Sequence, residues 1–334
     1  MKAWVINGEQ GIESLELVER EVPKPGPGEI LVRLWANSIN YRDLSTIKSV
    51  RARGILEPRI PNSDGAGIVE DIGDGVTAFK KGNRVVGTFF QDWTSGPIHD
   101  DAMASALGGA IDGLLCEYAI LNESGALPIP DNLSFEEAAT LPCAGLTAWN
   151  CLIEAGQARA GQTALLLGTG GVSIFAQQLA RASGIRTILT SSSEEKLDRA
   201  KALGAKDVIN YREHPDWEKK VMEMTDGRGV DLVVEVGGAG TLEKSIAAVR
   251  LGGRISLVGV LTGGQIDPTS IMRKSITLQG IYVGPRDMFA RLNAALSHND
   301  IHPVIDATVD FQDAKEAYRM MERAGHFGKI VIKI

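Results

Sequence analysis

The most constraining feature of this sequence is an alternation of apolar runs and helical segments between Thr163 and Leu261. The runs "TALLL", "RTILT" and "VDLVVEV" are typical of buried strands. The segments "GVSIFAQQLARASG" and "SSSEEKLDRAKALG" have the apolar spacing and the end signals of helices. Because parallel strands need a crossover connection between them, this alternation predicts βαβ units and an α/β fold with a doubly wound parallel sheet.

A glycine-rich turn follows the first of these strands. Gly168, Gly170 and Gly171 separate "TALLL" from the helix that continues through Val172. Glycines let backbone N–H groups approach a pyrophosphate, and the helix N-terminus then faces its negative charge. Ser173 replaces the third glycine of the usual pattern, so we expect a slightly looser helix–strand contact. The turn predicts a dinucleotide cofactor, although a plain βα loop is the alternative.

The end of the second strand bears on which nicotinamide dinucleotide is bound. An NAD site places an acidic residue there, on the ribose 2′-hydroxyl. This chain has Ser191 and Ser192, and Glu194 falls in the first turn of the next helix, where it serves the helix dipole. Small hydroxyl side chains leave room for a 2′-phosphate. The sequence therefore predicts NADPH rather than NADH.

Positive charge for that phosphate is available nearby. Lys196 lies one helical turn further on, and Tyr211 and Arg212 follow the third strand in "INYRE". We expect these residues to contribute to cofactor binding. Lys196 can equally be a residue of a solvated helix face, and this alternative stays open.

The two ends of the chain have a different texture. The segment "EILVRLWANSI" alternates and is rich in β-branched residues, and the last strand, "GKIVIKI", resembles it. We therefore expect a discontinuous β-rich domain from residues 1–125 and 286–334, with the dinucleotide-binding domain at 126–285. The irregular stretch 91–113 is long enough to suggest a functional loop.

Charge and cysteine usage exclude several classes of function. The formal net charge of −7 disfavours a nucleic-acid partner or an anionic membrane surface. The sequence contains no run of 18 apolar residues, so it predicts no membrane-spanning helix. The three cysteines, Cys116, Cys143 and Cys151, form no C-x-x-C pair, so we expect neither disulfides nor a structural zinc cluster. This cysteine usage is typical of a reducing compartment, and we expect a cytoplasmic location.

Together the motifs resemble one superfamily over essentially the whole chain. "GTGGVSIFAQQLA", "GVDLVVEVGG" and "GGRISLVGV" resemble the cofactor domain of the medium-chain dehydrogenases/reductases. "NSDGAGIVEDIGDGVTAFKKGNRVVG" and the C-terminal "GKIVIKI" resemble its catalytic domain. The resemblance implies a GroES-like β-rich domain built from both termini, a Rossmann domain inserted in it, and catalysis in the cleft between them.

The residues at the superfamily's zinc positions set this chain apart. Where zinc-dependent members have a cysteine and a histidine, it has Asn40 in "SINYRD" and Ser63 in "NSDGAG". Only Cys143 falls at the position of the third ligand, and one thiolate cannot hold catalytic zinc. The chain is thus identified as a member of the zinc-independent quinone oxidoreductase branch, which includes zeta-crystallin-like proteins, and no metal is expected.

This branch implies NADPH-dependent reduction of a quinone or of the C=C bond of an enone or enal. Without a metal, hydrogen-bond donors must polarise the acceptor oxygen. Asn40 is the first candidate for this catalytic role, and it is also expected to reach the cofactor. Tyr41 and Arg42 are weaker candidates, and Asp43 is as readily structural as catalytic. Solvent can deliver the proton.

The resemblance also implies further cofactor contacts. It places Thr147 at the nicotinamide, and it implies backbone contacts to the carboxamide from Val258, Gly259 and Val260. For these three residues a buried strand end is the alternative. By the same resemblance the remaining residues that line the cofactor cleft are Tyr282, Gly284 and Lys329.

Two further expectations concern partners and alternatives. The apolar segment 275–284, "SITLQGIYVG", predicts an edge strand. In relatives the equivalent strand pairs with a second subunit, so the resemblance implies a homodimer. The substrate is expected to be a small quinone, enal or carbonyl compound. A zinc-free alcohol or carbonyl oxidoreductase and a non-catalytic NADPH-binding protein remain alternative functions.

Overall fold

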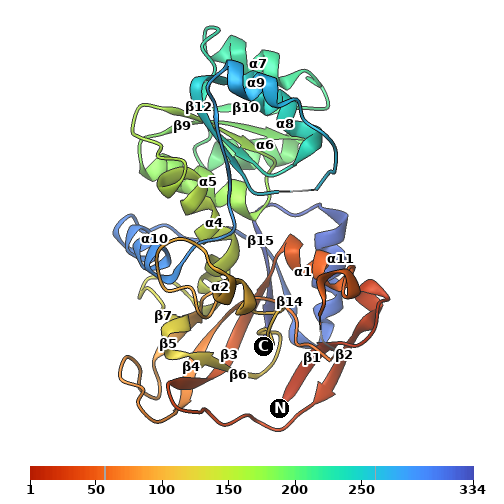
Figure 1. Ribbon diagram of the computed structural model, residues 1–334, viewed down its shortest axis with the longest axis vertical. Helices are drawn as coiled ribbons and strands as arrows, with labels where there is room; N and C mark the ends of the chain where they lie inside the picture. The colour runs from red at the N-terminus through yellow and green to blue at the C-terminus, as the bar shows by residue number, and fades with distance from the viewer. Residues whose placement is uncertain (56–57, 260) are drawn as a thin grey trace. The chain divides into compact units, whose positions relative to one another are not determined.

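The computed structural model describes residues 1–55, 58–259 and 261–334, which form two compact units (Figure 1). Unit 1 comprises Met1–Leu146 and Val283–Ile334, and unit 2 comprises Thr147–Tyr282. A continuous unit is therefore inserted into a discontinuous one, as the sequence predicted. The boundaries differ from the predicted ones, because residues 126–146 and 283–285 belong to unit 1.

Unit 2 is built on a parallel sheet with the strand order β10-β9-β8-β11-β12-β13 among its described residues. This order is the one expected of a Rossmann sheet. The strands are β8 (Thr163–Leu167), β9 (Arg186–Ser191), β10 (Asp207–Asn210), β11 (Val230–Glu235), β12 (Val249–Leu257) and β13 (Thr277–Gly280). The helices are α5 (Gly171–Ala182), α6 (Glu194–Ala202), α7 (Trp217–Met224), α8 (Ala239–Ala248) and α9 (Pro268–Arg273).

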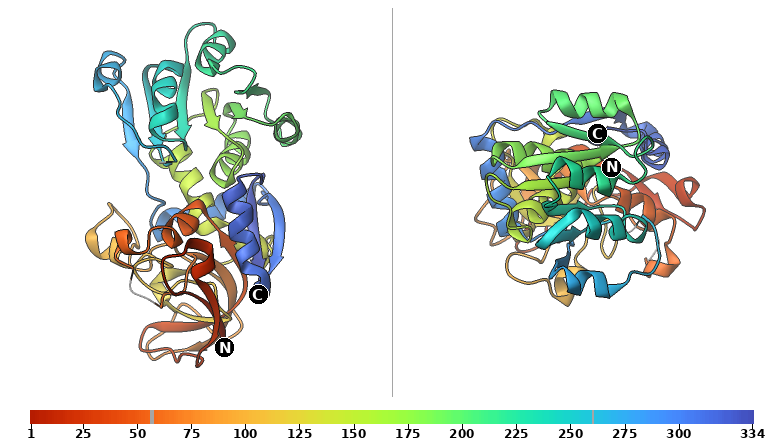
Figure 2. Two further views of the ribbon diagram at one scale, coloured as in Figure 1. Left: turned by 90° about the vertical axis from the view of Figure 1, so that its right-hand side faces the viewer. Right: turned by 90° about the horizontal axis from the view of Figure 1, so that it is seen from above.

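The parallel sheet carries helices on both faces (Figure 2). α5 and α6 contact β8, β9 and β10, whereas α7 and α8 contact each other and β10, β11 and β12. β8 and β11 are buried along their whole length, which explains their unbroken apolar runs. All strands point the same way, so their carboxyl ends meet at one edge of the sheet.

Unit 1 contains a mainly antiparallel sheet with the order β14-β15-β3-β4-β5-β7 in the part of the chain that is described, and β6 also pairs with β3. A separate hairpin joins β1 (Lys2–Ile6) and β2 (Leu15–Glu19). The sheet strands are β3 (Glu29–Ile39), β4 (Asp64–Ile72), β5 (Arg84–Gly87), β6 (Tyr118–Asn122), β7 (Ala126–Pro128), β14 (Ile305–Asp310) and β15 (Lys329–Lys333).

The helices of unit 1 are short except near the C-terminus. They are α1 (Tyr41–Ile47), α2 (Asp100–Ala104), α3 (Phe135–Ala138), α10 (Arg286–His298) and α11 (Ala314–Arg323), and α4 (Leu146–Trp149) lies at the boundary with unit 2. Ser134 caps α3 in a capping box with Glu137. Among the described residues, no helix has both the length and the apolar character needed to cross a membrane.

The pairing of β3 brings distant parts of the sequence together. β3 runs antiparallel to both β4 and β15, with Ser38 opposite Asp64 and Ile39 opposite Ile330. The carboxyl end of β3 therefore lies beside the first residues of β4 and of β15. The predicted discontinuity of this domain follows from the β3–β15 pairing, and a set of polar residues gathers where the three strands meet.

Candidate functional site

The strand junction of unit 1 holds a group of polar residues, most of them buried, which we call the polar cluster. It comprises Asn40, Asp43, Ser63, Asp64, Cys143 and Lys329. Asn40 follows β3, Ser63 and Asp64 stand at the start of β4, and Lys329 is the first residue of β15. Sequence analysis gave Asp64 no role, although its place directly after Ser63 in "NSDGAG" could have drawn attention to it.

Asn40 and Asp43 shape the turn from β3 into α1. Asn40 is the N-cap of α1, and its backbone N–H donates to Asp43 Oδ2 over 2.8 Å. Asp43 is 1% exposed. The Asp43 carboxylate therefore has the structural role, binding the backbone of the turn, which was one of the two alternatives for this residue. The polar stretch that follows β3 is therefore the start of a helix with a capping box.

Lys329 is almost fully buried and binds the end of β3. Its side-chain nitrogen donates to Ile39 O over 2.8 Å and to Asn40 Oδ1 over 2.5 Å. Burial lowers the pKa of this ammonium group, while the Asp64 carboxylate acts against that shift. The other end of the Asn40 amide, Nδ2, is buried and makes no hydrogen bond within the described residues.

Asp64 is fully buried and accepts two hydrogen bonds. Ser63 Oγ donates to Oδ1 over 2.7 Å, and the backbone N–H of Cys143 donates to Oδ2 over 3.1 Å. Cys143 lies in a π-helical turn, Leu141–Gly145, a distortion that often occurs at functional sites. Burial raises the pKa of the Asp64 carboxyl to about 6, although Lys329 and the side chains of Ser63 and Asn40 lower it.

Tyr41 and Arg42 differ from Asn40 in their surroundings. Tyr41 is 51% exposed. Arg42 donates to Asp43 Oδ1 over 3.0 Å and to Leu107 O over 2.8 Å, and its guanidinium lies 4.7 Å from the centre of the Phe89 ring. The bond to Leu107 O ties Arg42 to the 91–113 segment.

The polar cluster does not suit a zinc ion. Asn40 Oδ1 already accepts a hydrogen bond from an ammonium group, and Ser63 donates its hydroxyl to a carboxylate. Burial raises the pKa of the Cys143 thiol far above its usual range. Within residues 1–55, 58–259 and 261–334, no three His, Cys, Asp or Glu side chains form a group that could hold a metal ion.

A second chain of buried polar groups supports the first residues of β4. Asn62 has φ 65°, a left-handed conformation that asparagine tolerates better than most residues. Tyr318 Oη from α11 donates to Asn62 Oδ1, and Asn62 Nδ2 donates to Asn37 Oδ1 over 2.6 Å. This chain fixes the backbone just before Ser63. Sequence analysis missed both Asn62 and Tyr318, because their contacts join residues 256 positions apart.

In unit 2, the glycine-rich turn lies at the carboxyl end of β8. Gly168 has φ 74°, and a Cβ atom on Gly168 or Gly170 would meet no atom within 4 Å. The surface over the turn is therefore open to a pyrophosphate, and the first N–H groups of α5 follow from Gly171 and Val172. Ser173 Oγ donates to Leu167 O over 2.6 Å, so a hydrogen bond joins helix and strand where a looser contact was expected.

The ends of β9 and β10 lie side by side. The backbone N–H of Tyr211 donates to Ser191 O over 3.0 Å, which places Ser191 beside the "INYRE" segment. Glu194 Oε1 accepts a hydrogen bond of 2.6 Å from Asn210 Nδ2. Its carboxylate is thus engaged by a side chain of the neighbouring strand. Ser191 and Tyr211 are therefore neighbours, and Ser192, Lys196 and Arg212 follow them in the sequence.

The end of β12 is tied to β11. The backbone N–H groups of Val258 and Gly259 both donate to Glu235 O, over 2.9 and 3.2 Å. A Cβ atom on Gly259 would lie 1.6 Å from Val236 O, so only glycine fits. A cofactor contact at these residues would therefore use their carbonyl oxygens. Val260, the third residue of this prediction, lies outside the described residues.

Glu235, the last residue of β11, stabilises the turn that follows this strand. Its side chain is fully buried and accepts hydrogen bonds from the N–H groups of Gly237 and Gly238 and from the hydroxyls of Thr241 and Ser245. Sequence analysis gave this residue no role. A carboxylate at the end of an apolar strand, followed by two glycines, was the available signal.

The remaining predicted cofactor residues are divided between the units. Thr147 is 3% exposed and Tyr282 is 44% exposed, and they are the first and last residues of unit 2. Gly284 and Lys329 belong to unit 1, together with Asn40. A Cβ atom on Gly284 would lie 2.7 Å from Met288 Sδ, so close packing explains this glycine.

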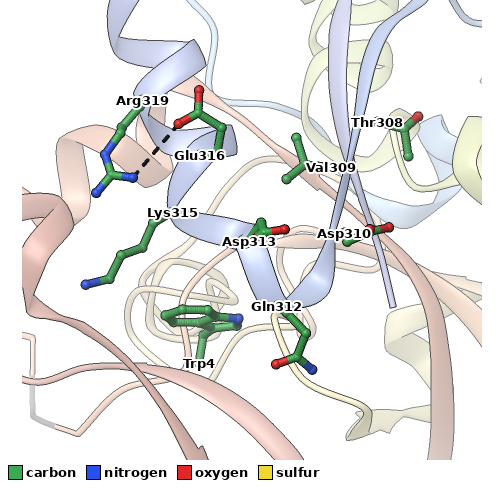
Figure 3. A pocket seen from close by; sticks show the side chains of 9 residues that line it. All are labelled: Trp4, Thr308, Val309, Asp310, Gln312, Asp313, Lys315, Glu316 and Arg319. Carbon is green, nitrogen blue, oxygen red and sulfur yellow. Dashed lines mark ion pairs between the residues drawn. The ribbon is translucent and has the colours of Figure 1, made fainter.

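An open hollow of unit 1 lies elsewhere, over β14 and α11 (Figure 3). Lys315, Glu316 and Arg319 of α11 line it together with Trp4. Lys315 and Arg319 each form an ion pair with Glu13. None of the predicted site residues lines this hollow, and its mixed charge indicates no ligand.

Two family models match the chain. The model described as the alcohol dehydrogenase GroES-like domain matches residues 26–131, and the model described as a zinc-binding dehydrogenase matches residues 171–298. Each match falls mainly in one of the two units.

Similar proteins match over nearly the whole chain. A zinc-type alcohol dehydrogenase-like protein of Schizosaccharomyces pombe is 44% identical over 99% of both chains. The quinone oxidoreductase of Rattus norvegicus is 28% identical over 93% of this chain and 91% of its own. The crystal structure of an NAD-dependent alcohol dehydrogenase has a TM-score of 0.92 at 34% identity and covers all of both chains.

Proposed function

Because the chain belongs to the medium-chain dehydrogenase/reductase superfamily, in its quinone oxidoreductase branch, we propose that this oxidoreductase reduces a quinone or an α,β-unsaturated carbonyl compound with NADPH and without a metal. The observation that carries the proposal is the Asn40 amide. Its oxygen accepts from a buried ammonium group, and its Nδ2 is a buried donor with no hydrogen bond among the described residues. Such a donor suits a carbonyl oxygen.

The roles of the residues follow from this assignment. Asn40 Nδ2 donates to the acceptor oxygen and stabilises the negative charge that develops there. Lys329 and Asp64 stay buried beside it and keep the polar cluster close to neutral. Tyr41, which is exposed, is free to contact the ring of the acceptor, whereas Arg42 holds the 91–113 segment. Solvent supplies the proton.

The residues of unit 2 suit a nicotinamide dinucleotide, which supplies hydride when bound. The open turn at Gly168 and Gly170 receives the pyrophosphate. We propose NADPH because Ser191 and Ser192 leave space for a 2′-phosphate and the Glu194 carboxylate is engaged by Asn210. Lys196 and Arg212 supply positive charge there. The NAD-dependent structural neighbour makes NADH the competing assignment.

A zinc-free alcohol or carbonyl oxidoreductase is the second candidate. The names of the S. pombe relative and of the structural neighbour favour an alcohol dehydrogenase, and the absence of zinc in this candidate rests on Asn40 and Ser63 instead. Both candidates use the same Asn40 donor, since an aldehyde oxygen needs the same polarisation. They differ in the substrate carbon that receives the hydride.

A panel assay separates these candidates. Oxidation of NADPH and of NADH is followed at 340 nm with a quinone, an enal and a saturated aldehyde of similar size. The proposal expects turnover of the quinone or the enal and a lower KM for NADPH. Turnover of the aldehyde alone would establish the second candidate, and a lower KM for NADH would overturn the choice of cofactor.

The role of Asn40 is tested by substitution. Asn40→Ala removes the donor, and we expect kcat to fall by about a hundredfold, the usual effect of losing one oxyanion donor. The matched control is Asn299→Ala, because Asn299 is an exposed residue at the end of α10. Unchanged turnover in Asn40→Ala would contradict the assignment of Asn40.

We also propose that the chain forms a homodimer through β13. This strand is the edge of the parallel sheet, and the residues around it include large exposed apolar side chains. They are Leu251, Leu261, Ile266, Met272 and Tyr282. Pairing of β13 with its copy would cover an edge that is otherwise open to aggregation. The cytoplasmic location stays a prediction from the sequence.

A further inference from the structure

The contacts of the Lys329 side chain are of a kind that orients the neighbouring Asn40 rather than binds a ligand. The residue is 3% exposed, and its nitrogen donates to two acceptors at the end of β3, Ile39 O and Asn40 Oδ1. The first bond anchors the ammonium group to the backbone. The second holds the oxygen of the Asn40 amide, so the two bonds fix one residue relative to the other.

Holding the oxygen of an amide decides where its nitrogen lies. If the Asn40 amide turned over, its NH2 group would face the ammonium nitrogen 2.5 Å away, donor against donor. That arrangement is strongly unfavourable in a buried site, where no water can separate the two groups. Only the orientation with Nδ2 directed away from Lys329 is therefore stable.

The surrounding charges keep the ammonium group in place. Asp64 and Asp43 are both buried in the polar cluster, and the carboxylate of each favours the charged form of Lys329. These acids come from β4 and α1, so two elements besides β15 hold the cation. Arg42 is occupied by Asp43 and by Leu107 O and does not compete for Asn40.

We propose that Lys329 is the positioning residue for the Asn40 amide, holding Oδ1 so that Nδ2 is presented to the acceptor oxygen. The inference rests on the proposed function of Asn40 and assigns Lys329 a role other than cofactor binding. In this chain a fixed ammonium group takes part in organising the site at which zinc-dependent relatives hold a metal.

A double-mutant cycle tests the proposal. Lys329→Met keeps the length of the side chain and removes the ammonium group, and we expect kcat to fall about tenfold through a misoriented donor. The dissociation constant of NADPH, measured by fluorescence titration, should stay within about twofold. In Lys329→Met/Asn40→Ala the loss should match that of Asn40→Ala alone, because Lys329 acts through that amide.

Controls separate positioning from other effects. Lys333→Met removes an exposed lysine of the same strand and should change neither constant. Lys329→Met/Asp64→Asn keeps the polar cluster neutral and should fold even if Lys329→Met does not, with the same loss of kcat. A weaker affinity for NADPH with unchanged kcat would overturn the proposal in favour of cofactor binding. So would losses that multiply in the double variant.

A measurement that needs no turnover keeps this inference separate from the proposed function. Selective labelling with [15N]asparagine gives the side-chain NH2 signals, and Asn40→Ala identifies the pair from Asn40. Lys329→Met should move the two proton signals of this pair toward those of an unrestrained asparagine side chain, because Oδ1 is no longer held. An unchanged pair would refute positioning by Lys329, whatever the substrate panel shows.

Discussion

Asp64 is a buried carboxylate whose ionisation opposes folding. Its pKa rises from 3.8 to about 6 in the folded chain, mainly through burial. Between these values the folded state binds the proton more tightly than the unfolded state does. The free energy of unfolding therefore falls as the pH rises from about 4 to about 6, and it levels off above that.

Asp64→Asn should remove this dependence. The shift of about two units corresponds to about 3 kcal/mol between pH 4 and pH 7. We expect the variant to gain stability relative to the natural chain as the pH rises across this range. Thermal unfolding at pH 4.5 and at pH 7 measures the difference. An equal difference at both pH values would show that Asp64 does not titrate in this window.

The individual residues differ in how far the sequence could reveal them. Asn40 was predicted because it stands where the superfamily's motif has cysteine, and the glycines of the turn were predicted because their spacing is local. The contact of Lys329 with Asn40 joins residues 289 positions apart. No periodicity contains such a contact, so the resemblance alone suggested Lys329, and it suggested a different role.

At the level of elements, the C-terminus of α8 depends on one lysine. Lys274 Nζ donates to Ile246 O, Ala247 O and Val249 O, three carbonyl groups at the end of the helix. The last carbonyls of a helix have no partner within it, and a cation there also favours the helix dipole. Lys274 is therefore a cap for α8 that comes from a distant segment.

Lys274→Met should loosen the end of α8. We expect a loss of about 2 kcal/mol in stability, since hydrogen bonds to a charged donor are worth about that much. Hydrogen exchange of the amides around Ala248 should become faster in the variant. Lys219→Met, at an exposed lysine paired with Asp216, serves as the control. Unaltered exchange at the end of α8 would argue against capping by Lys274.

The elements of unit 2 were predicted more fully than those of unit 1. Apolar runs alternate with capped helical segments throughout the sequence from β8 to β12, and this repetition made the elements predictable. α1 was missed, because Asn40 to Asp43 are four polar or amphipathic residues and only seven residues form the helix. Its capping box, with Asn40 and Asp43 three positions apart, was the signal that could have located it.

For the whole molecule, the edge of the parallel sheet gives a prediction about assembly. Leu251→Glu/Met272→Glu introduces charges at side chains that are 70% and 67% exposed. If β13 joins two subunits, we expect sedimentation to show monomers in this variant and dimers in the natural chain. Val22→Glu, at an exposed residue of unit 1, is the matched control. A natural chain that sediments as a monomer would rule out the dimer.

The division into units was harder to predict than the folds themselves. Residues 126–146 precede the first strand of the Rossmann sheet, and their helical texture favoured assignment to that domain. β7 instead pairs with β5, and Cys143 contacts Asp64, so this segment belongs to unit 1. These pairings depend on the three-dimensional path of the chain, which the local pattern does not contain.

The antiparallel partners of β3 also set an order for events on the ribosome. Asn40 and Asp64 leave the exit tunnel early, but Lys329 follows only after all of unit 2 has been synthesised. Unit 2 is continuous and can fold while the sheet of unit 1 still lacks β14 and β15. Until β15 emerges, the Asp64 carboxylate has no buried cation beside it. The nascent protein can thus fold the unit that carries the glycine-rich turn before it can assemble the polar cluster.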